Sequence, residues 1–189
     1  MVIMKRISLS LLVALLCVAW ASGADVQGRI AYIRQAYDAA QSAIAMADDE
    51  PMTRNTFSIT VDQMYPGSGP HKEKIEFFFT CLDFDVDDHA EDGSIVWRSQ
   101  LYLVRQSYNI GGHEFYNEYL YDMETGEPLF ALTTGPDDDG EQQSMRVYFD
   151  KGQVVHTIPA TQLNPAGLLS EFKRLHNIFE TVILRSPLI

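Results

Sequence analysis

The sequence predicts an α+β domain, with an N-terminal amphipathic helix, a curved antiparallel meander of about seven strands and a C-terminal amphipathic helix. Three observations lead to this prediction. Aromatic-rich apolar runs separated by turn signals fill the stretch from Ile95 to Ile158. The connections between these runs are short, whereas a parallel crossover needs a dozen or more residues. Before and after the runs, apolar residues recur at helical spacing.

The expected strands show alternation with a period of two. Met145, Val147 and Phe149 fall on one side of their strand, and the intervening residues are polar or half-polar. Turn residues such as Gly111-Gly112 and Asp150 to Gln153 separate consecutive strands, because glycine reaches positive φ without steric cost. The apolar parity changes midway between residues 95 and 110, which predicts a β-bulge. The expected strands are 57–61, 75–84, 95–110, 115–121, 129–132, 145–149 and 154–158.

Two stretches show the apolar stripe of a helix that docks on a sheet. The first stripe contains Val26, Ile30, Ile33, Tyr37, Ala40, Ile44 and Ala47. The second, which begins after Asn164-Pro165, contains Leu168, Phe172, Leu175, Phe179 and Val182. Both helices are expected on the sheet face that carries Phe77, Phe79 and Val147.

Residues 1–24 have the layout of a secretory signal peptide. Lys5 and Arg6 precede an apolar core from Ile7 to Ala19, and small residues follow at a cleavage site. The domain is therefore expected to comprise residues 25–189, exported to the periplasm or the extracellular space. Cys17 raises the alternative of a lipoprotein, but bulky Leu16 precedes it where a small residue is expected. No later run is long and apolar enough to cross a membrane.

The charge of the chain restricts its partners. The formal net charge is −12, and loss of Lys5 and Arg6 with the leader changes it to −14. Such an acidic surface argues against nucleic acid or anionic lipid as a partner. Cys81 is then the remaining cysteine, so an internal disulfide is excluded. The absence of an Asn-x-Ser/Thr sequon fits a bacterial cell envelope.

An acidic stretch at residues 83–94 is the candidate metal site. Asp83, Asp85 and Asp87 alternate like the first ligands of a calcium loop, and His89 offers a nitrogen ligand. The pattern then departs from a calcium loop, because Asp88 and Ser94 occupy the positions of the required Gly and Glu. The alternative is a solvated acidic turn. A second acidic run, Asp137 to Glu141, is a weaker candidate, because neighbouring carboxylates repel and stay hydrated.

The sequence contains no Gly-x-Ser-x-Gly elbow, Walker loop or dinucleotide fingerprint. Cys81 lies mid-strand beside Phe79 and Leu82, where a free cysteine usually packs as a small hydrophobe. The five histidines show no pair with zinc-ligand spacing. No cofactor is therefore predicted apart from the calcium considered above.

The second face of the sheet is the candidate ligand-binding surface. Its aromatic and apolar residues combine apolar area with hydroxyl groups, which suits a protein or glycan partner. They are Phe78, Leu82, Tyr102, Tyr116 and Tyr148. The alternative is that the sheet curls and buries this face in its own core, since aromatic residues favour strands in any case.

These features lead to a functional hypothesis with one alternative. We expect an exported, non-catalytic binding or interaction module of the bacterial cell envelope, whose partner is a protein, peptide or glycan. The alternative is a secreted or periplasmic hydrolase with a carboxylate and histidine site. A histidine such as His89 or His113 within hydrogen-bond reach of a carboxylate in a pocket would favour the hydrolase.

Overall fold

The computed structural model describes residues 25–46, 55–67, 69–81 and 99–184. The N-terminal helix covers residues 25–45. Seven strands and the C-terminal helix α2 (Ala166–Phe179) follow, and α2 continues into a π-helical segment, η2 (Glu180–Leu184). The predicted α+β class is confirmed: one helix precedes the seven strands in the sequence, and one helix follows them. Within the described residues, no helix combines the length and the apolar character that a membrane span needs.

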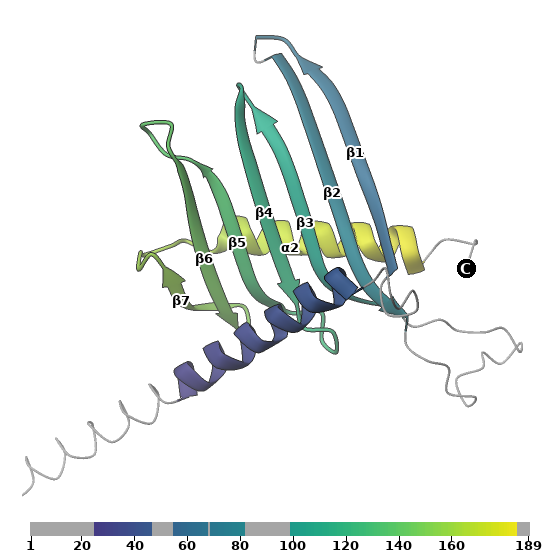
Figure 1. The fold of residues 1–189 in the computed structure, drawn as a ribbon, viewed down its shortest axis with the longest axis vertical. Helices are drawn as coiled ribbons and strands as arrows, with labels where there is room; N and C mark the ends of the chain where they lie inside the picture. The colour runs from purple at the N-terminus through teal and green to yellow at the C-terminus, as the bar shows by residue number, and fades with distance from the viewer. Residues whose placement is uncertain (1–24, 47–54, 68, 82–98, 185–189) are drawn as a thin grey trace, which may run out of the picture.

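The strands form one open antiparallel meander in which every strand pairs with its neighbours in sequence (Figure 1). Tight turns join several of these strands; in the last hairpin, for example, Lys151 and Gly152 both have positive φ. The strands are β1 (Asn55–Tyr65), β2 (Gly69–Cys81), β3 (Ser99–Ile110), β4 (His113–Tyr121), β5 (Pro128–Pro136), β6 (Gln142–Asp150) and β7 (Gln153–Ile158).

The two helices lie on opposite faces of the sheet, so the expectation that both would cover one face is wrong. Figure 1 shows the N-terminal helix in front of the strands and α2 behind them. Ile33 of the N-terminal helix packs with Phe78, Leu103 and Tyr148, on what we call the N-helix face. Phe172, Leu175 and Phe179 of α2 pack against Phe77 and Val147, on the α2 face. The molecule therefore has three layers and two cores.

The predicted bulge is confirmed, and two similar bulges accompany it. Phe78 pairs with Leu103 and Phe79 with Leu101, so Tyr102 is an extra residue in β3. In the same way, Leu129 is an extra residue in β5 and Val155 in β7. All three extra residues belong to the core beneath the N-terminal helix. Since a bulge bends its strand, these bulges account for the curved lower end of the sheet.

Both helices cross only the lower half of the sheet, and the β1–β2, β3–β4 and β5–β6 hairpins extend well beyond them (Figure 1). The start of α2 differs slightly from the expected cap. Ala166 is the first helical residue, and its N–H donates to Oδ1 of Asn164 at 3.1 Å. The uncovered upper half of the sheet leaves room for a site beside α2.

Candidate ligand groove on the α2 face

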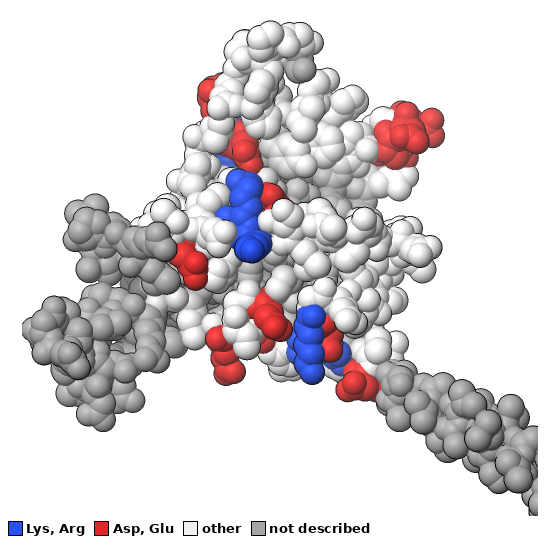
Figure 2. All heavy atoms as spheres, turned by 180° about the vertical axis from the view of Figure 1, so that it is seen from behind, with Lys and Arg blue, Asp and Glu red and all other residues white. Residues whose placement is uncertain are grey.

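A groove of about 740 Å³ lies where the strands extend past α2. Gly167, Leu168, Glu171 and Arg174 of α2 form one wall, and β3 to β6 form the floor. Figure 2 shows this side of the molecule: charged side chains run down its middle, and a broad uncharged area separates them from the acidic β5–β6 turn. The groove thus has a charged wall beside a largely uncharged floor.

Two buried amides form the centre of the floor. Gln106 is 6% exposed and Asn117 7% exposed. Both point to the α2 face, as the apolar core residues Val104 and Tyr119 of the same strands do. The Nε2 of Gln106 donates to Glu73 Oε1 at 2.7 Å and to Glu171 Oε1 at 3.3 Å. Its Oε1 accepts from Asn117 Nδ2 at 3.1 Å and from the Tyr119 hydroxyl at 3.3 Å. These bonds satisfy both ends of the Gln106 amide, which fixes its orientation.

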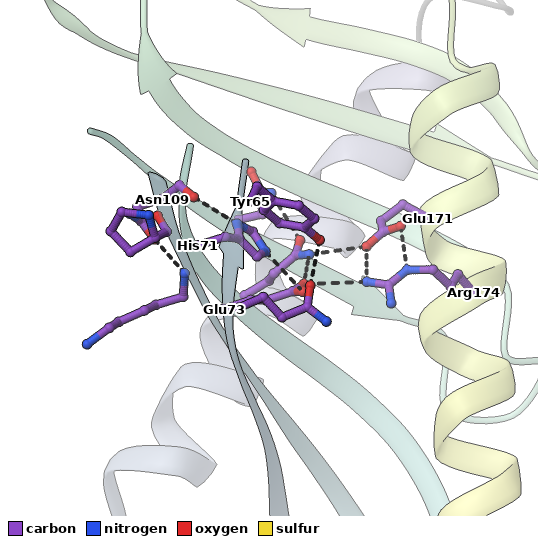
Figure 3. Close-up of polar contacts among 11 residues, drawn as sticks. Tyr65, His71, Glu73, Asn109, Glu171 and Arg174 are labelled. Atoms are coloured by element: carbon purple, nitrogen blue, oxygen red, sulfur yellow. Dashed lines mark hydrogen bonds and ion pairs between the residues drawn. The ribbon is translucent and has the colours of Figure 1, made fainter. Parts of the chain in front are cut away.

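Arg174 links the wall to the floor (Figure 3). Its guanidinium donates to both carboxylate oxygens of Glu171, at 2.8 and 2.6 Å, and lies 3.7 Å from Glu73 Oε1. Hydrogen bonds from Arg174 to Glu171, and the negative charges of Glu171 and Glu73, raise the pKa of Arg174. Two carboxylates thus share one cation, and the cluster keeps an excess of negative charge.

His71 lies at the edge of this cluster. Its Nδ1 is 2.8 Å from the carbonyl oxygen of Asn109, which only accepts hydrogen bonds, so Nδ1 carries the hydrogen. The other ring nitrogen, Nε2, is 3.9 Å from Glu73 Oε2. That distance is too long for a hydrogen bond. His71 is therefore oriented by the backbone rather than by a carboxylate.

A row of aromatic rings crosses the strands next to the polar floor. The ring centroids of Tyr65 and His71 are 5.6 Å apart, and those of His71 and Tyr108 are 6.5 Å apart. Tyr108 stacks on Phe115 at 5.0 Å with the planes within 7° of parallel. Phe115 lies directly over Gly135, where an added Cβ would be 2.6 Å from Cδ1 of the Phe115 ring. The rings thus run from β1 to β4, and the last of them covers Gly135 of β5.

Four of the five residues predicted to bind a ligand lie within the described chain, and all four are on the other face. Phe78, Tyr102 and Tyr148 are buried in the core beneath the N-terminal helix. Tyr116 is half-buried and donates to Glu118, and Leu82 lies outside the described residues. Tyr148 lines a pocket of about 270 Å³ beside Arg34 and Tyr37, and Tyr102 lines one of about 280 Å³ beside Tyr32 and Met123. The ligand-binding role of these residues stays a prediction.

The predicted metal ligands Asp83, Asp85, Asp87 and His89 also lie outside the described residues, so calcium binding there stays a prediction. In the described part of the chain, no group of three or more His, Cys, Asp or Glu residues is arranged to hold a metal ion. Asp137 orders its turn instead: its carboxylate accepts backbone N–H groups from Asp139 and Glu141, which lowers its pKa.

A second polar cluster holds the N-terminal helix on the sheet. The Glu118 side chain is 4% exposed and lies 3.1 Å from Arg105 Nε. It also accepts hydrogen bonds from Tyr37, Gln41 and Tyr116. Burial, followed by the hydrogen bond to Glu118, raises the pKa of both Tyr37 and Tyr116. This cluster is enclosed by helix and sheet, and we interpret it as structural.

One pattern in the sequence does indicate the groove. In three neighbouring strands, a polar side chain occupies a position whose alternation points toward the α2 face. These residues are Glu73, Gln106 and Asn117. A polar residue at a core-facing position in three strands indicates a buried polar site. No family model, curated protein or solved structure matches this chain. Its function must therefore be argued from the groove itself.

Proposed function

We propose that this protein is an exported, non-catalytic binding module that receives an uncharged glycan segment in the groove on the α2 face. The observation that carries the proposal is the stacked pair of Tyr108 and Phe115, which lines the groove together with the polar floor of Gln106 and Asn117. His71 and Tyr65 continue this row of rings beyond the groove lining. A sugar ring has C–H groups on its faces and hydroxyl groups around its edge. It therefore matches aromatic rings on one side and amides on the other.

Charge supports an uncharged ligand. The chain carries a net charge of −12, and Glu73 and Glu171 outnumber Arg174 in the groove. The net charge and the excess of carboxylates in the cluster at the groove wall both oppose acidic polysaccharides, nucleic acids and anionic lipid surfaces. Export, predicted from residues 1–24, would bring the groove to the compartment that contains cell-wall and extracellular glycans.

The hydrolase alternative receives less support from the groove. The histidine beside the groove is His71, whose Nε2 lies 3.9 Å from Glu73 Oε2, beyond hydrogen-bond range. The Nδ1 of His71 is hydrogen-bonded to the backbone carbonyl of Asn109. His113 is exposed at the start of β4. Glu73 and Glu171 both accept hydrogen bonds from Gln106, and Arg174 binds Glu171 through both oxygens. The carboxylates of Glu73 and Glu171 therefore serve as hydrogen-bond acceptors for Gln106 and Arg174 and do not contact any histidine of the described chain at hydrogen-bond distance.

The test is a titration of residues 25–189 with neutral oligosaccharides, acidic oligosaccharides and peptides, followed by amide NMR shifts. We expect neutral oligosaccharides to shift the amides of β3 to β5 and the first turns of α2. Tyr108→Ala should weaken binding about tenfold, because a buried aromatic contact contributes about 1.5 kcal/mol. Tyr32→Ala is the matched control, because Tyr32 is 48% exposed on the N-terminal helix, on the other face.

Three results would count against the proposal. Amide shifts confined to the N-helix face would instead favour the binding surface predicted from the sequence, which contains Tyr102, Tyr116 and Tyr148. Equal affinity of wild type and Tyr108→Ala would remove the aromatic row from binding. Release of shorter saccharides during the titration would favour the hydrolase.

A further inference from the structure

Strand β1 is a long edge strand of the sheet. It pairs with β2 on one side, and among the residues that the structure describes no strand pairs with its other side, since the sheet order runs from β1 to β7. β1 has eleven residues, whereas the opposite edge strand, β7, has six. Every second residue of β1 therefore directs a backbone N–H and C=O away from the sheet.

The sequence of β1 lacks the features that normally prevent edge pairing. It contains no proline and no lysine, and Asp62 is its one charged residue. Lys72 of β2 lies 3.9 Å from Asp62 and partly offsets that charge. Phe57, Ile59 and Val61 alternate with Ser58 and Thr60, a composition with high strand propensity.

Exposed apolar side chains lie at both ends of the same edge. Met64 is 73% and Tyr65 47% exposed, and both belong to β1. Val182, 39% exposed, belongs to η2. Figure 1 shows the helix that leads into η2 crossing the whole sheet and ending at β1, in agreement with the contact between Phe57 and Phe179. These three make up a large share of the exposed large hydrophobic residues in the described chain.

We propose that two copies of this chain associate through antiparallel pairing of their β1 strands, with the twofold axis at Thr60. In this register all eleven residues of each strand are paired. Ile59 faces Val61 of the second copy on the α2 face, and Thr60 faces its own counterpart on the N-helix face. Asp62 faces Ser58, so no two like charges are directly opposite.

A second copy fits this edge because the edge is complementary to itself. The twofold axis keeps both α2 helices on the same side of the joined sheet. It also places η2 of each copy beside the upper end of the other copy's β1, where Tyr65 is exposed. The acidic net charge of each copy opposes association at long range, so salt should strengthen the dimer by screening.

The first test is sedimentation velocity of residues 25–189 over a hundredfold range of concentration, at 0.05 M and 0.5 M NaCl. We expect a monomer–dimer equilibrium that shifts toward dimer at the higher salt. Thr60→Glu should weaken the dimer about fivefold, because it places two carboxylates opposite each other beside two Asp62 residues. Thr60 is exposed and pairs with Lys74 in β2, so this variant should still fold. Gln153→Glu, at the β7 edge, is the control of equal charge.

The second test fixes the register. Thr60→Cys should form an intermolecular disulfide under mild oxidation, because residues on the axis face their own counterparts. Thr56→Cys should not, because Thr56 would face Met64 of the second copy. A monomer at every concentration and salt would overturn the proposal, and so would equal cross-linking of the two cysteine variants. A dimer that Thr60→Glu leaves unchanged would place the interface elsewhere and overturn it as well.

Discussion

At the scale of single residues, Glu118 shows how the sequence holds a charge inside a small domain. Its carboxylate is buried between sheet and helix, where an ion without partners would be very costly. Arg105 supplies the opposite charge and also lies over the Phe78 ring, 5.2 Å from its centroid. Tyr37, Gln41 and Tyr116 supply hydrogen bonds.

We therefore expect Glu118→Ala to lower the free energy of unfolding by about 3 kcal/mol, because it removes the carboxylate that pairs with Arg105 and accepts from two tyrosine hydroxyls, and leaves Arg105 with the uncharged amide oxygen of Gln41. Urea unfolding followed by far-UV circular dichroism measures the change. Glu114→Ala is the matched control, since Glu114 is exposed on the same strand and the same face. It should change the value by less than about 0.5 kcal/mol. Equal losses in the two variants would contradict the structural role of Glu118.

Gly135 is a second residue whose identity the structure explains. Because an added Cβ would lie 2.6 Å from the Phe115 ring, Gly135→Ala should displace Phe115 from its stack on Tyr108. We expect a loss of about 1 kcal/mol of stability and weaker glycan binding. Gly28→Ala is the control, because no atom lies within 4 Å of its Cβ position and alanine favours a helix. An unchanged Tyr108–Phe115 contact by NMR would argue against the expected displacement.

At the scale of elements, local patterns predicted most of the fold. Alternation located the strands, and glycine turns made consecutive strands antiparallel neighbours. The parity change in β3 indicated a real bulge at Tyr102. The faces of the helices were not predictable in the same way. A stripe such as Ile30 and Ile33 shows that a helix buries one side, but it does not show which face of a two-sided sheet receives it.

The groove was missed for a related reason. β2, β3 and β4 each contribute one charged or amide side chain to its polar centre, so no segment by itself looks like a site. Glu73, Gln106 and Asn117 come together only when β2, β3 and β4 are set in register. The predicted aromatic face, in contrast, was a true cluster: Phe78, Tyr102 and Tyr148 do lie in one core. What the strand pattern left open was the helix that covers them.

The docking of the N-terminal helix can be tested as a property of that element. Ile33 has no exposed surface beneath the helix, so Ile33→Ala should cost about 3 kcal/mol. Tyr32→Ala, a neighbour that is 48% exposed, should cost less than about 0.5 kcal/mol. Hydrogen exchange in Ile33→Ala should be faster in residues 25–45 than in β2 to β4. Uniform acceleration over both layers would mean that the helix and the sheet unfold only together.

At the scale of the whole molecule, folding removes four tyrosines from water to different degrees: Tyr119 and Tyr121 are buried, and Tyr37 and Tyr116 are half-buried. Burial, the largest cause in each case, raises the pKa of Tyr37, Tyr116, Tyr119 and Tyr121 above the usual value. In the unfolded chain such groups lose their protons near pH 10. The folded chain therefore holds more protons than the unfolded chain above that pH, and its free energy of unfolding must fall as the pH rises further.

This linkage gives a prediction for the whole chain. The free energy of unfolding, measured with urea at steps from about pH 8 to pH 11.5, should decline steeply above about pH 10. Each tyrosine that stays protonated in the fold adds up to about 1.4 kcal/mol per pH unit to the slope. The double variant Tyr37→Phe/Tyr116→Phe should start from a lower stability at pH 8, because it loses the hydrogen bonds to Glu118, and should then decline less steeply. Lysine titration is the same in the wild type and the double variant, so it cancels in the comparison. Equal slopes for the two proteins would mean that the fold does not keep the hydroxyls of Tyr37 and Tyr116 protonated.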